Sequence, residues 1–207
     1  MNNAEQQNHC QDEFQTGSIK DVQLRVVTFQ ELWDNYPSGN PYNNSVYKDQ
    51  CAIRMSVMFH RVGIEMKSFS EKLVRPLSDR PSIGRIILDG KATATRADEL
   101  GEWLKLQPFA GLPKAEDITG SDWESKVKGR TGIVEFSRYW TRAGETTSNA
   151  SGGHIDLWNG ARLTISSAPD AVATISRYFG GQSFFPGTDF GWSDLRNAKQ
   201  ILFWQIK

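Results

Sequence analysis

The sequence predicts an α+β fold, with helices in its first half and antiparallel strands later. Apolar side chains recur with the 3.6-residue period of a helix over residues 48–62. Residues 131–140, 153–158 and 201–206 instead contain the short apolar runs that are typical of strands. No stretch of about 18 apolar residues occurs, so we expect no membrane-spanning helix.

Length and charge narrow the classes of function. A chain of 207 residues is long enough for one domain and short for two. The 24 Lys and Arg residues are balanced by 24 Asp and Glu residues, whereas a nucleic-acid-binding protein usually carries a basic surplus. The first 20 residues lack the basic head and apolar stretch of a secretory signal peptide. We therefore expect one domain that neither binds nucleic acid nor inserts into a membrane.

The polar start of the chain predicts a disordered arm over residues 1–18. This segment is rich in Asn and Gln and has almost no aliphatic side chains, so it buries too little apolar surface to offset the entropy of ordering. Residues 19–207 are expected to form the single domain. Its first segment, residues 22–29, either alternates like a strand or leads into a short helix through residues 31–35. A loop rich in Pro, Gly and Asn follows over residues 36–45.

Three helices are predicted before the strands. Asp49 or Ser45 is expected to cap the helix over residues 48–62, and Gly63 to end it. Residues 97–106 predict a second helix, and residues 123–127 a short third one. Residues 85–90 predict a short buried strand or turn.

The second half of the chain predicts a hairpin and a buried last strand. Asn159-Gly160 is a type I′ turn signal, which would pair the strand over residues 153–158 with residues 161–165. Residues 169–179 begin with Pro and predict a short helix. Residues 201–206 are apolar without polar alternation, which favours a strand buried between two neighbours.

One cysteine and one histidine form the candidate for chemistry. Cys51 lies near the start of the first helix, where the helix dipole and unpaired N–H groups lower the pKa of a thiol. His154 lies early on a later strand, and Asp156, two residues on, shares its face. A cysteine on a helix that packs against a histidine on a sheet is the papain-type pairing of nucleophile and base. The alternative is that both residues are structural.

The sequence contains no pattern that indicates a metal site or a bound cofactor. The two cysteines and three histidines follow neither a CxxC pattern nor a zinc-ligand spacing. We therefore expect no metal and no cofactor.

Two strings resemble a known family. QCAIRMS at residues 50–56, followed by Gly63, and GHIDLWNG at residues 153–160 resemble the amidase effectors of bacterial type VI secretion, in particular the fourth amidase family. The closing stretch, residues 192–207, also looks like the last strand of that family. The resemblance covers residues 40–65 and 131–207, and leaves residues 66–130 as a variable insertion region.

The resemblance implies a fold, a substrate and partners. Members of that family fold like papain and the NlpC-type peptidases and cleave the peptide stems of peptidoglycan, typically between D-glutamate and meso-diaminopimelate. Cys51 falls on the family's nucleophile and His154 on its general base. The implied partners are the peptidoglycan stem, a cognate immunity protein and the secretion machine. That machine would deliver a protein without a signal peptide into the periplasm of a target bacterium.

The third catalytic residue departs from the family pattern. Some members carry an Asp about eleven residues past the histidine, where this chain has Ile165. A hydrocarbon cannot hold an imidazole tautomer. Asp156 is the nearest acid on the predicted face and is our assignment, with Asp170 or a backbone carbonyl as the alternatives.

Other functions and other residues stay open from the sequence. An acyltransferase or transglutaminase-like enzyme would use the same pair, and a binding or immunity-type module would use neither residue. Gln50 is a candidate oxyanion donor beside the backbone N–H of Cys51. Arg54 and His60 are expected to be structural, and Trp158 to pack beneath the hairpin.

Overall fold

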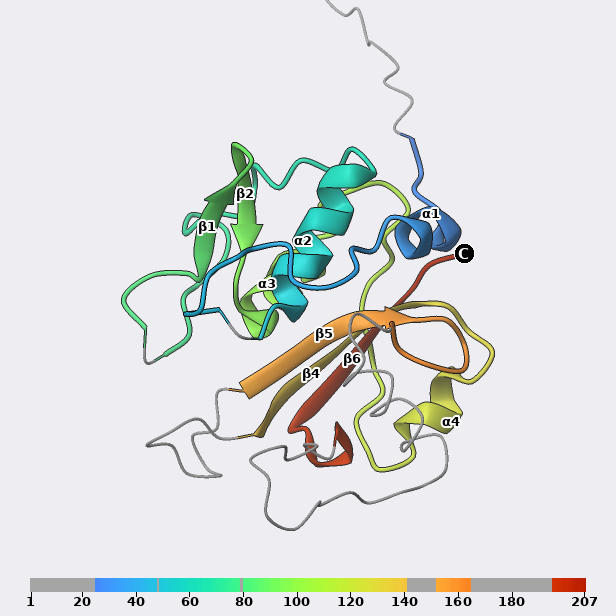
Figure 1. Ribbon diagram of the computed structural model, residues 1–207. Coiled ribbons are helices and arrows are strands. Elements are labelled where there is room, and N and C mark those ends of the chain that lie inside the picture. Colours follow the sequence, from blue (N-terminus) through green and yellow to red (C-terminus); the bar gives the residue numbers. More distant parts are fainter. Residues whose placement is uncertain (1–24, 48, 79, 141–151, 165–194) are drawn as a thin grey trace, which may run out of the picture.

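A computed structural model describes residues 25–47, 49–78, 80–140, 152–164 and 195–207 (Figure 1). The helices are α1 (Phe29–Asp34), α2 (Cys51–Arg61), α3 (Ala97–Lys105) and α4 (Trp123–Val127), with a 3-10 turn at Leu195–Asn197. The strands are β1 (Arg85–Leu88), β2 (Lys91–Ala94), β3 (Glu116–Asp117), β4 (Gly132–Trp140), β5 (Gly152–Trp158) and β6 (Gln200–Gln205). The α+β prediction is confirmed, and the likeness to papain and NlpC stays a prediction.

The main sheet leaves β5 at its edge. Four antiparallel strands follow the order β3-β6-β4-β5, and β1 and β2 form a separate hairpin. Strand β6 lies between β3 and β4, which confirms the predicted burial of residues 201–206. In the β4–β5 register Phe136 lies opposite His154.

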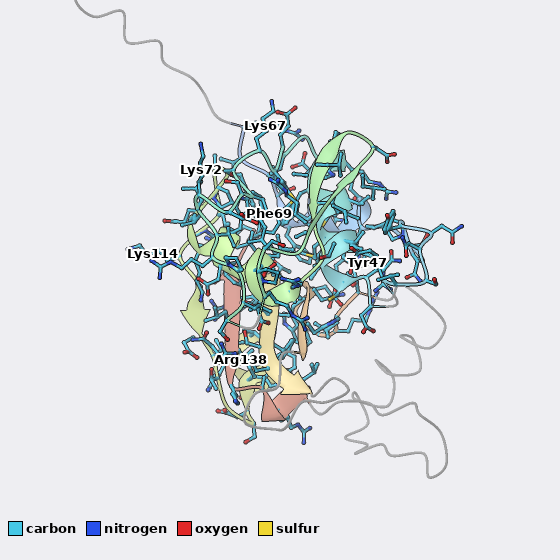
Figure 2. The ribbon with its side chains drawn as sticks, turned by 90° about the vertical axis from the view of Figure 1, so that its left-hand side faces the viewer. Tyr47, Lys67, Phe69, Lys72, Lys114 and Arg138 are labelled. Atoms are coloured by element: carbon cyan, nitrogen blue, oxygen red, sulfur yellow. The ribbon has the colours of Figure 1, made fainter. Side chains whose placement is uncertain are left out.

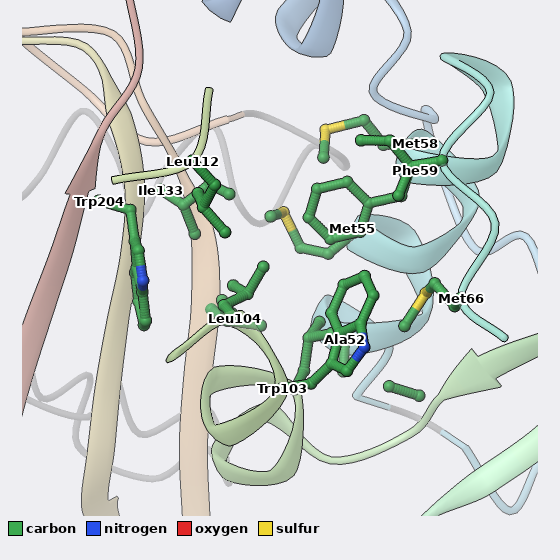
Figure 3. Close-up of a cluster of buried hydrophobic side chains, with 14 of the residues drawn as sticks. Ala52, Met55, Met58, Phe59, Met66, Trp103, Leu104, Leu112, Ile133 and Trp204 are labelled. Atoms are coloured by element: carbon green, nitrogen blue, oxygen red, sulfur yellow. The ribbon is translucent and has the colours of Figure 1, made fainter. Parts of the chain in front are cut away.

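Two hydrophobic cores cover the two faces of this sheet. Helices α2 and α3 contribute to the larger core, and α4 belongs to the smaller one on the opposite face (Figure 1). Figure 3 shows side chains of α3 between those of α2 and those of the sheet, among them Met55, Phe59, Leu104, Ile133 and Trp204. No helix within the described ranges is long and apolar enough to cross a membrane.

Helix α2 begins three residues later than its periodicity predicts. Its N-cap is Gln50, which makes no capping bond through its side chain, so the expected caps Asp49 and Ser45 are both wrong. Gly63 ends the helix as predicted: it has a φ of 84°, and its N–H donates to the carbonyl of His60 at 3.2 Å.

The β1–β2 hairpin contains a type I′ turn, the type that we expected at Asn159-Gly160. Asp89 and Gly90 both have positive φ, 50° and 75°, as the two central residues of a type I′ turn require. Strand β1 is not the buried strand we predicted, because only β2 faces α2, and Ile87 is 64% exposed. The hairpin is attached to α2 by a 3.1 Å bond from the N–H of Ala94 to the hydroxyl of Ser56.

The type I′ turn predicted at Asn159-Gly160 is wrong. Only Gly160 has a positive φ there, and the side-chain oxygen of Asn159 accepts the N–H groups of Ala161 and Arg162 at 3.1 and 2.9 Å. These bonds make a compact turn. An antiparallel β-bridge then joins Trp158 to Leu163, and up to residue 164, where the described segment ends, the predicted pairing is limited to this bridge. The residues expected to form an arm (1–18) and a helix (169–179) lie outside the described residues.

The expected insertion region is integral to the core. Residues 66–130 include α3, and Nε1 of Trp103 donates to the hydroxyl of Ser68 at 2.9 Å. Figure 2 shows Phe69 in the interior of this region, whereas Lys67 and Lys72 point outward. Its variability stays a prediction, but its side chains help to bury α2.

A glycine sets how closely α3 approaches the sheet. A Cβ atom on Gly101 would lie 2.0 Å from Oε2 of Glu135, a carboxyl group on β4 that is 2% exposed. Burial, with the charge of Asp98 as a smaller cause, raises the pKa of Glu135 well above its usual value. The raised pKa favours the neutral, protonated form of this side chain, which occupies the space that the glycine leaves.

We expect Gly101→Ala to destabilise the fold by about 1–3 kcal/mol, because the added methyl overlaps a buried side chain. Urea unfolding measures this free energy. The double variant Gly101→Ala/Glu135→Ala is the control: it should show favourable coupling, since it removes the overlapping carboxyl. An alanine variant as stable as the original chain would contradict this packing.

Candidate active site

The structure brings Cys51 and His154 together. Cys51 is the first residue of α2, and its thiol is free of a disulfide. The sulfur is hydrogen-bonded to the ring of His154 and to the backbone of Ile155. Since β5 is an edge strand, the N–H of Ile155 reaches the sulfur from the open side of the sheet. The start of α2 is thereby joined to the edge of β5.

Asp156 lies beside the histidine, on the face predicted from strand alternation. Oδ2 of Asp156 is 3.5 Å from Nε2 of His154. The residues between and after them, Ile155 and Leu157, point into the larger core. The ring of Phe136, on the neighbouring strand, stacks on that of His154 with centroids 6.4 Å apart. The imidazole is thus held between a phenyl ring, a carboxylate and a thiol.

The Asp156 carboxylate is buried and well supplied with donors. The side chain is 6% exposed. Its Oδ1 accepts the N–H of Leu157 at 2.8 Å and also accepts the hydroxyl of Thr164. A buried carboxylate is tolerated where such donors replace water.

The pair favours a charged thiol and a charged imidazole. Burial alone would raise the pKa of Cys51, but its bonds to His154 and Ile155 and the charges of His154 and Arg54 lower that pKa below its usual value. Burial likewise acts to lower the pKa of His154, but bonds to Asp156 and Cys51 raise it to about 9. Both shifts therefore favour a thiolate–imidazolium pair over the neutral pair.

Gln50 is not available as an oxyanion donor. Its amide nitrogen donates to the carbonyls of Tyr42 (2.6 Å) and Tyr47 (2.9 Å), and its amide oxygen accepts the N–H of Tyr42 at 3.0 Å. Both amide hydrogens are thus used to hold the loop before α2. Figure 2 shows Tyr47 beside the first turn of that helix. The expectation for Gln50 is wrong, and the backbone N–H of Cys51 is the remaining candidate.

Arg54 and His60, which we expected to have structural roles, contact other parts of the fold. Arg54 donates to the carbonyl of Gly39 at 3.0 Å and to the side chain of Asn40 at 3.1 Å. The Nε2 atom of His60 lies 3.0 Å from the carbonyl of Ala92, away from Cys51.

Trp158 packs against α4 rather than beneath a hairpin. Its Nε1 donates to the carbonyl of Val127 at 3.0 Å, and its ring meets that of Trp123 with centroids 5.3 Å apart.

Sequence reasoning missed Tyr36, Thr164 and Phe136. Tyr36 follows α1, and its hydroxyl is hydrogen-bonded to that of Thr164. Neither residue belongs to a periodic pattern, and only the place of Thr164 beside Ile165 pointed to this segment. Ile165 and Asp170 lie outside the described residues. Within the described residues no group of three or more His, Cys, Asp or Glu side chains is placed to hold a metal ion.

Comparison with known families gives one match, over residues 47–204, to Tae4, described as type VI secretion system (T6SS) amidase effector protein 4. The matched range contains Cys51, His154 and Asp156. No curated protein matches.

Three solved structures are similar to this chain. The effector Tae4 from Enterobacter cloacae is 16% identical, with 90% of this chain and all of that chain covered and a TM-score of 0.50. The Tae4–Tai4 effector–immunity complex from the same organism is 17% identical, with coverages of 87% and 98% and a TM-score of 0.49. Tae4 from Salmonella typhimurium, in complex with Tai4 from Enterobacter cloacae, is 15% identical, with coverages of 86% and 98% and a TM-score of 0.47. At these identities the first structure shows a shared fold.

We expect iodoacetamide at pH 6 to alkylate Cys51 at least about tenfold faster in the folded protein than in the urea-unfolded chain, where the thiol has its ordinary pKa. The folded pKa of Cys51 is lowered and that of His154 is raised to about 9, so a larger share of Cys51 is thiolate in the folded protein than in the unfolded chain at the same pH. Mass spectrometry of the Cys51 peptide measures the rate.

The matched control for this reaction is His154→Ala, which should lose the acceleration because the imidazolium is absent. Equal rates in the folded and unfolded chains at pH 6 would contradict the ion pair.

Proposed function

Since this chain belongs to the Tae4 family of type VI secretion amidase effectors, we propose that it is an antibacterial enzyme that hydrolyses the peptide stems of peptidoglycan. The observation that carries this proposal is the contact of Cys51 with His154 at the start of α2, with Asp156 beside the ring. We assign these three residues as nucleophile, general base and orienting acid, within a papain-like arrangement.

The reaction begins with attack by the thiolate. The sulfur of Cys51 adds to the carbonyl carbon of the scissile amide, and the negative charge moves to the carbonyl oxygen. The backbone N–H of Cys51, at the first turn of a helix where such groups lack intrahelical partners, donates to this oxyanion. The imidazolium of His154 then gives its proton to the leaving amine, and a thioester remains on Cys51.

Water completes the cycle. His154, now neutral, removes a proton from a water molecule that attacks the thioester carbonyl. The carboxylic acid leaves, and the thiolate and the imidazolium are regenerated.

Asp156 acts on the ring in both half-reactions. Its Oδ2 lies toward Nε2, which leaves Nδ1 for the thiol. It therefore fixes the tautomer and stabilises the imidazolium, without itself becoming protonated.

The bond between D-glutamate and meso-diaminopimelate is the proposed site of cleavage. Mass spectrometry of a digest of purified sacculi tests it, because cleavage there frees the amine of diaminopimelate. Transfer of the acyl group to an added amine, instead of to water, would identify an acyltransferase on the same fold.

The location of the substrate implies the partners. Peptidoglycan lies outside the cytoplasm, so we propose that the secretion machine delivers the enzyme into the periplasm of a target bacterium. The producing cell contains the same substrate, and neighbouring cells of its own kind also inject the enzyme into it. We therefore propose a cognate immunity protein that inhibits this chain.

We expect Cys51→Ala and His154→Ala each to abolish stem hydrolysis while the protein stays folded, because the pair acts as a unit. The double variant should be no worse than either single one. Muropeptide profiles after digestion of sacculi measure the activity, and urea unfolding checks the fold.

His60→Ala is the matched histidine control and should retain hydrolysis, since this ring contacts the carbonyl of Ala92 on the β1–β2 hairpin. Identical muropeptide profiles from the unmodified chain and Cys51→Ala would rule out the enzymatic proposal.

We expect Asp156→Asn to lower turnover by a factor on the order of 10²–10⁴, since an amide neither stabilises the imidazolium nor holds the correct tautomer. Asp170→Asn should cost less than about tenfold if Asp156 is the orienting acid, because the catalytic unit then does not include Asp170. Initial rates of stem cleavage compare the two. If Asp170→Asn showed the large loss of turnover and Asp156→Asn did not, Asp170 would be assigned as the orienting acid.

A further inference from the structure

We propose that Tyr36 and Thr164 are positioning residues that turn the Asp156 carboxylate toward His154. This inference rests on the proposed function, because it concerns how the orienting acid is itself oriented. Each of the two residues acts through the carboxylate.

The two oxygens of Asp156 have different surroundings. Oδ1 accepts both the N–H of Leu157 at 2.8 Å and the hydroxyl of Thr164, whereas Oδ2 lies 3.5 Å from Nε2 of His154. The backbone bond alone leaves the carboxylate free to rotate about its χ2 torsion, which has a broad energy profile. A second donor on the same oxygen, from another segment, restricts that rotation.

The direction of the bonds fixes the role of Tyr36. The single hydroxyl hydrogen of Thr164 is donated to Asp156, so the oxygen of Thr164 accepts in its bond with Tyr36. Tyr36 therefore donates. Burial, together with the charge of Asp156, raises the pKa of Tyr36 well above its usual value, so the phenol keeps the proton that this requires. The resulting chain runs from Tyr36 through Thr164 to Asp156.

Separate contacts hold the two segments that carry these hydroxyls. Thr164 directly follows the β-bridge of Leu163 with Trp158. The guanidinium of Arg162, in the same turn, lies over the ring of Trp33 at 5.0 Å, and Trp33 belongs to α1, which Tyr36 follows. This cation–π contact joins the end of α1 to the turn after β5. Tyr36 and Thr164 thus meet because two elements distant in sequence are packed together.

A purely structural role makes a different prediction from a positioning role. Thr164 also satisfies a buried carboxylate, so its loss lowers stability in either case. Only positioning links the hydroxyl to the protonation of His154, because the raised pKa of that ring depends on its bond to Asp156. Rotation of the carboxylate away from the ring would weaken this bond and lower the pKa of His154.

The test compares Thr164→Val, which keeps the shape and removes the hydroxyl, with Thr164→Ser, which keeps the hydroxyl. We expect the valine variant to lower kcat by about tenfold with KM unchanged, and the serine variant to stay within about twofold of the original enzyme. The pKa of His154, measured by NMR titration of the ring, should be lower in the valine variant than in the original chain and unchanged in the serine variant, because its raised value depends on the bond to Asp156. Tyr36→Phe should also lower both kcat and the pKa of His154, but by less than Thr164→Val does.

A valine variant with an unchanged pKa of His154, or with kcat no lower than that of the serine variant, overturns the proposal. If Thr164→Val does not fold, Tyr36→Phe decides in the same way, since it removes one buried oxygen and keeps the ring. The NMR titration needs no substrate. An enzyme without stem hydrolysis would therefore refute the proposed function, while the titration still decides the positioning of Asp156.

Discussion

The contact between the first turn of α2 and the outer edge of β5 is the constraint on which the site depends. The sulfur of Cys51 accepts the backbone N–H of Ile155, so the proposed nucleophile is held against the strand that carries His154 and Asp156. This requires an edge strand, because an N–H group inside a sheet is already paired. The sheet order β3-β6-β4-β5 provides that edge. Within the described residues, β5 is followed by an Asx-type turn at Asn159.

The charge balance of the site follows from this geometry. Burial disfavours both the thiolate and the imidazolium, and each would be neutral if it were buried alone. The proximity of the thiol and the imidazole reverses the direction of both pKa shifts: the pKa of Cys51 falls and that of His154 rises to about 9. Asp156 adds to the second effect through its bond to the ring, while Leu157 and Thr164 donate to its other oxygen. The site is thus a chain of groups in which each charge is stabilised by the next.

The rest of the fold keeps this chain in place. Helices α2 and α3 share one core with the inward face of β5, so the side chains of Ile155 and Leu157 fix the strand that carries the catalytic face. Loops supply the remaining support. Gln50 holds the loop before the nucleophile through both of its amide hydrogens. On the other side, the pairing of Trp33 with Arg162 joins α1 to the turn that carries Thr164. The sheet edge and the anchored loops together place Cys51 beside His154 and Asp156, which come from a distant part of the chain.

The sequence by itself determined the elements and the candidate residues whose signals are local. Apolar periodicity located α2, α3 and α4, and short apolar runs located β4, β5 and β6. Alternation along one strand placed Asp156 on the face of His154, which needs no knowledge of any other segment. The tertiary structure alone decided the rest. It assigned Gln50 to the loop and not to the oxyanion, and it put the type I′ turn at Asp89-Gly90, where a paired strand could follow. It also brought Tyr36 to Thr164 across more than half of the chain. Such contacts leave no periodic trace in a sequence, because they depend on how whole elements pack and not on the spacing of neighbouring residues.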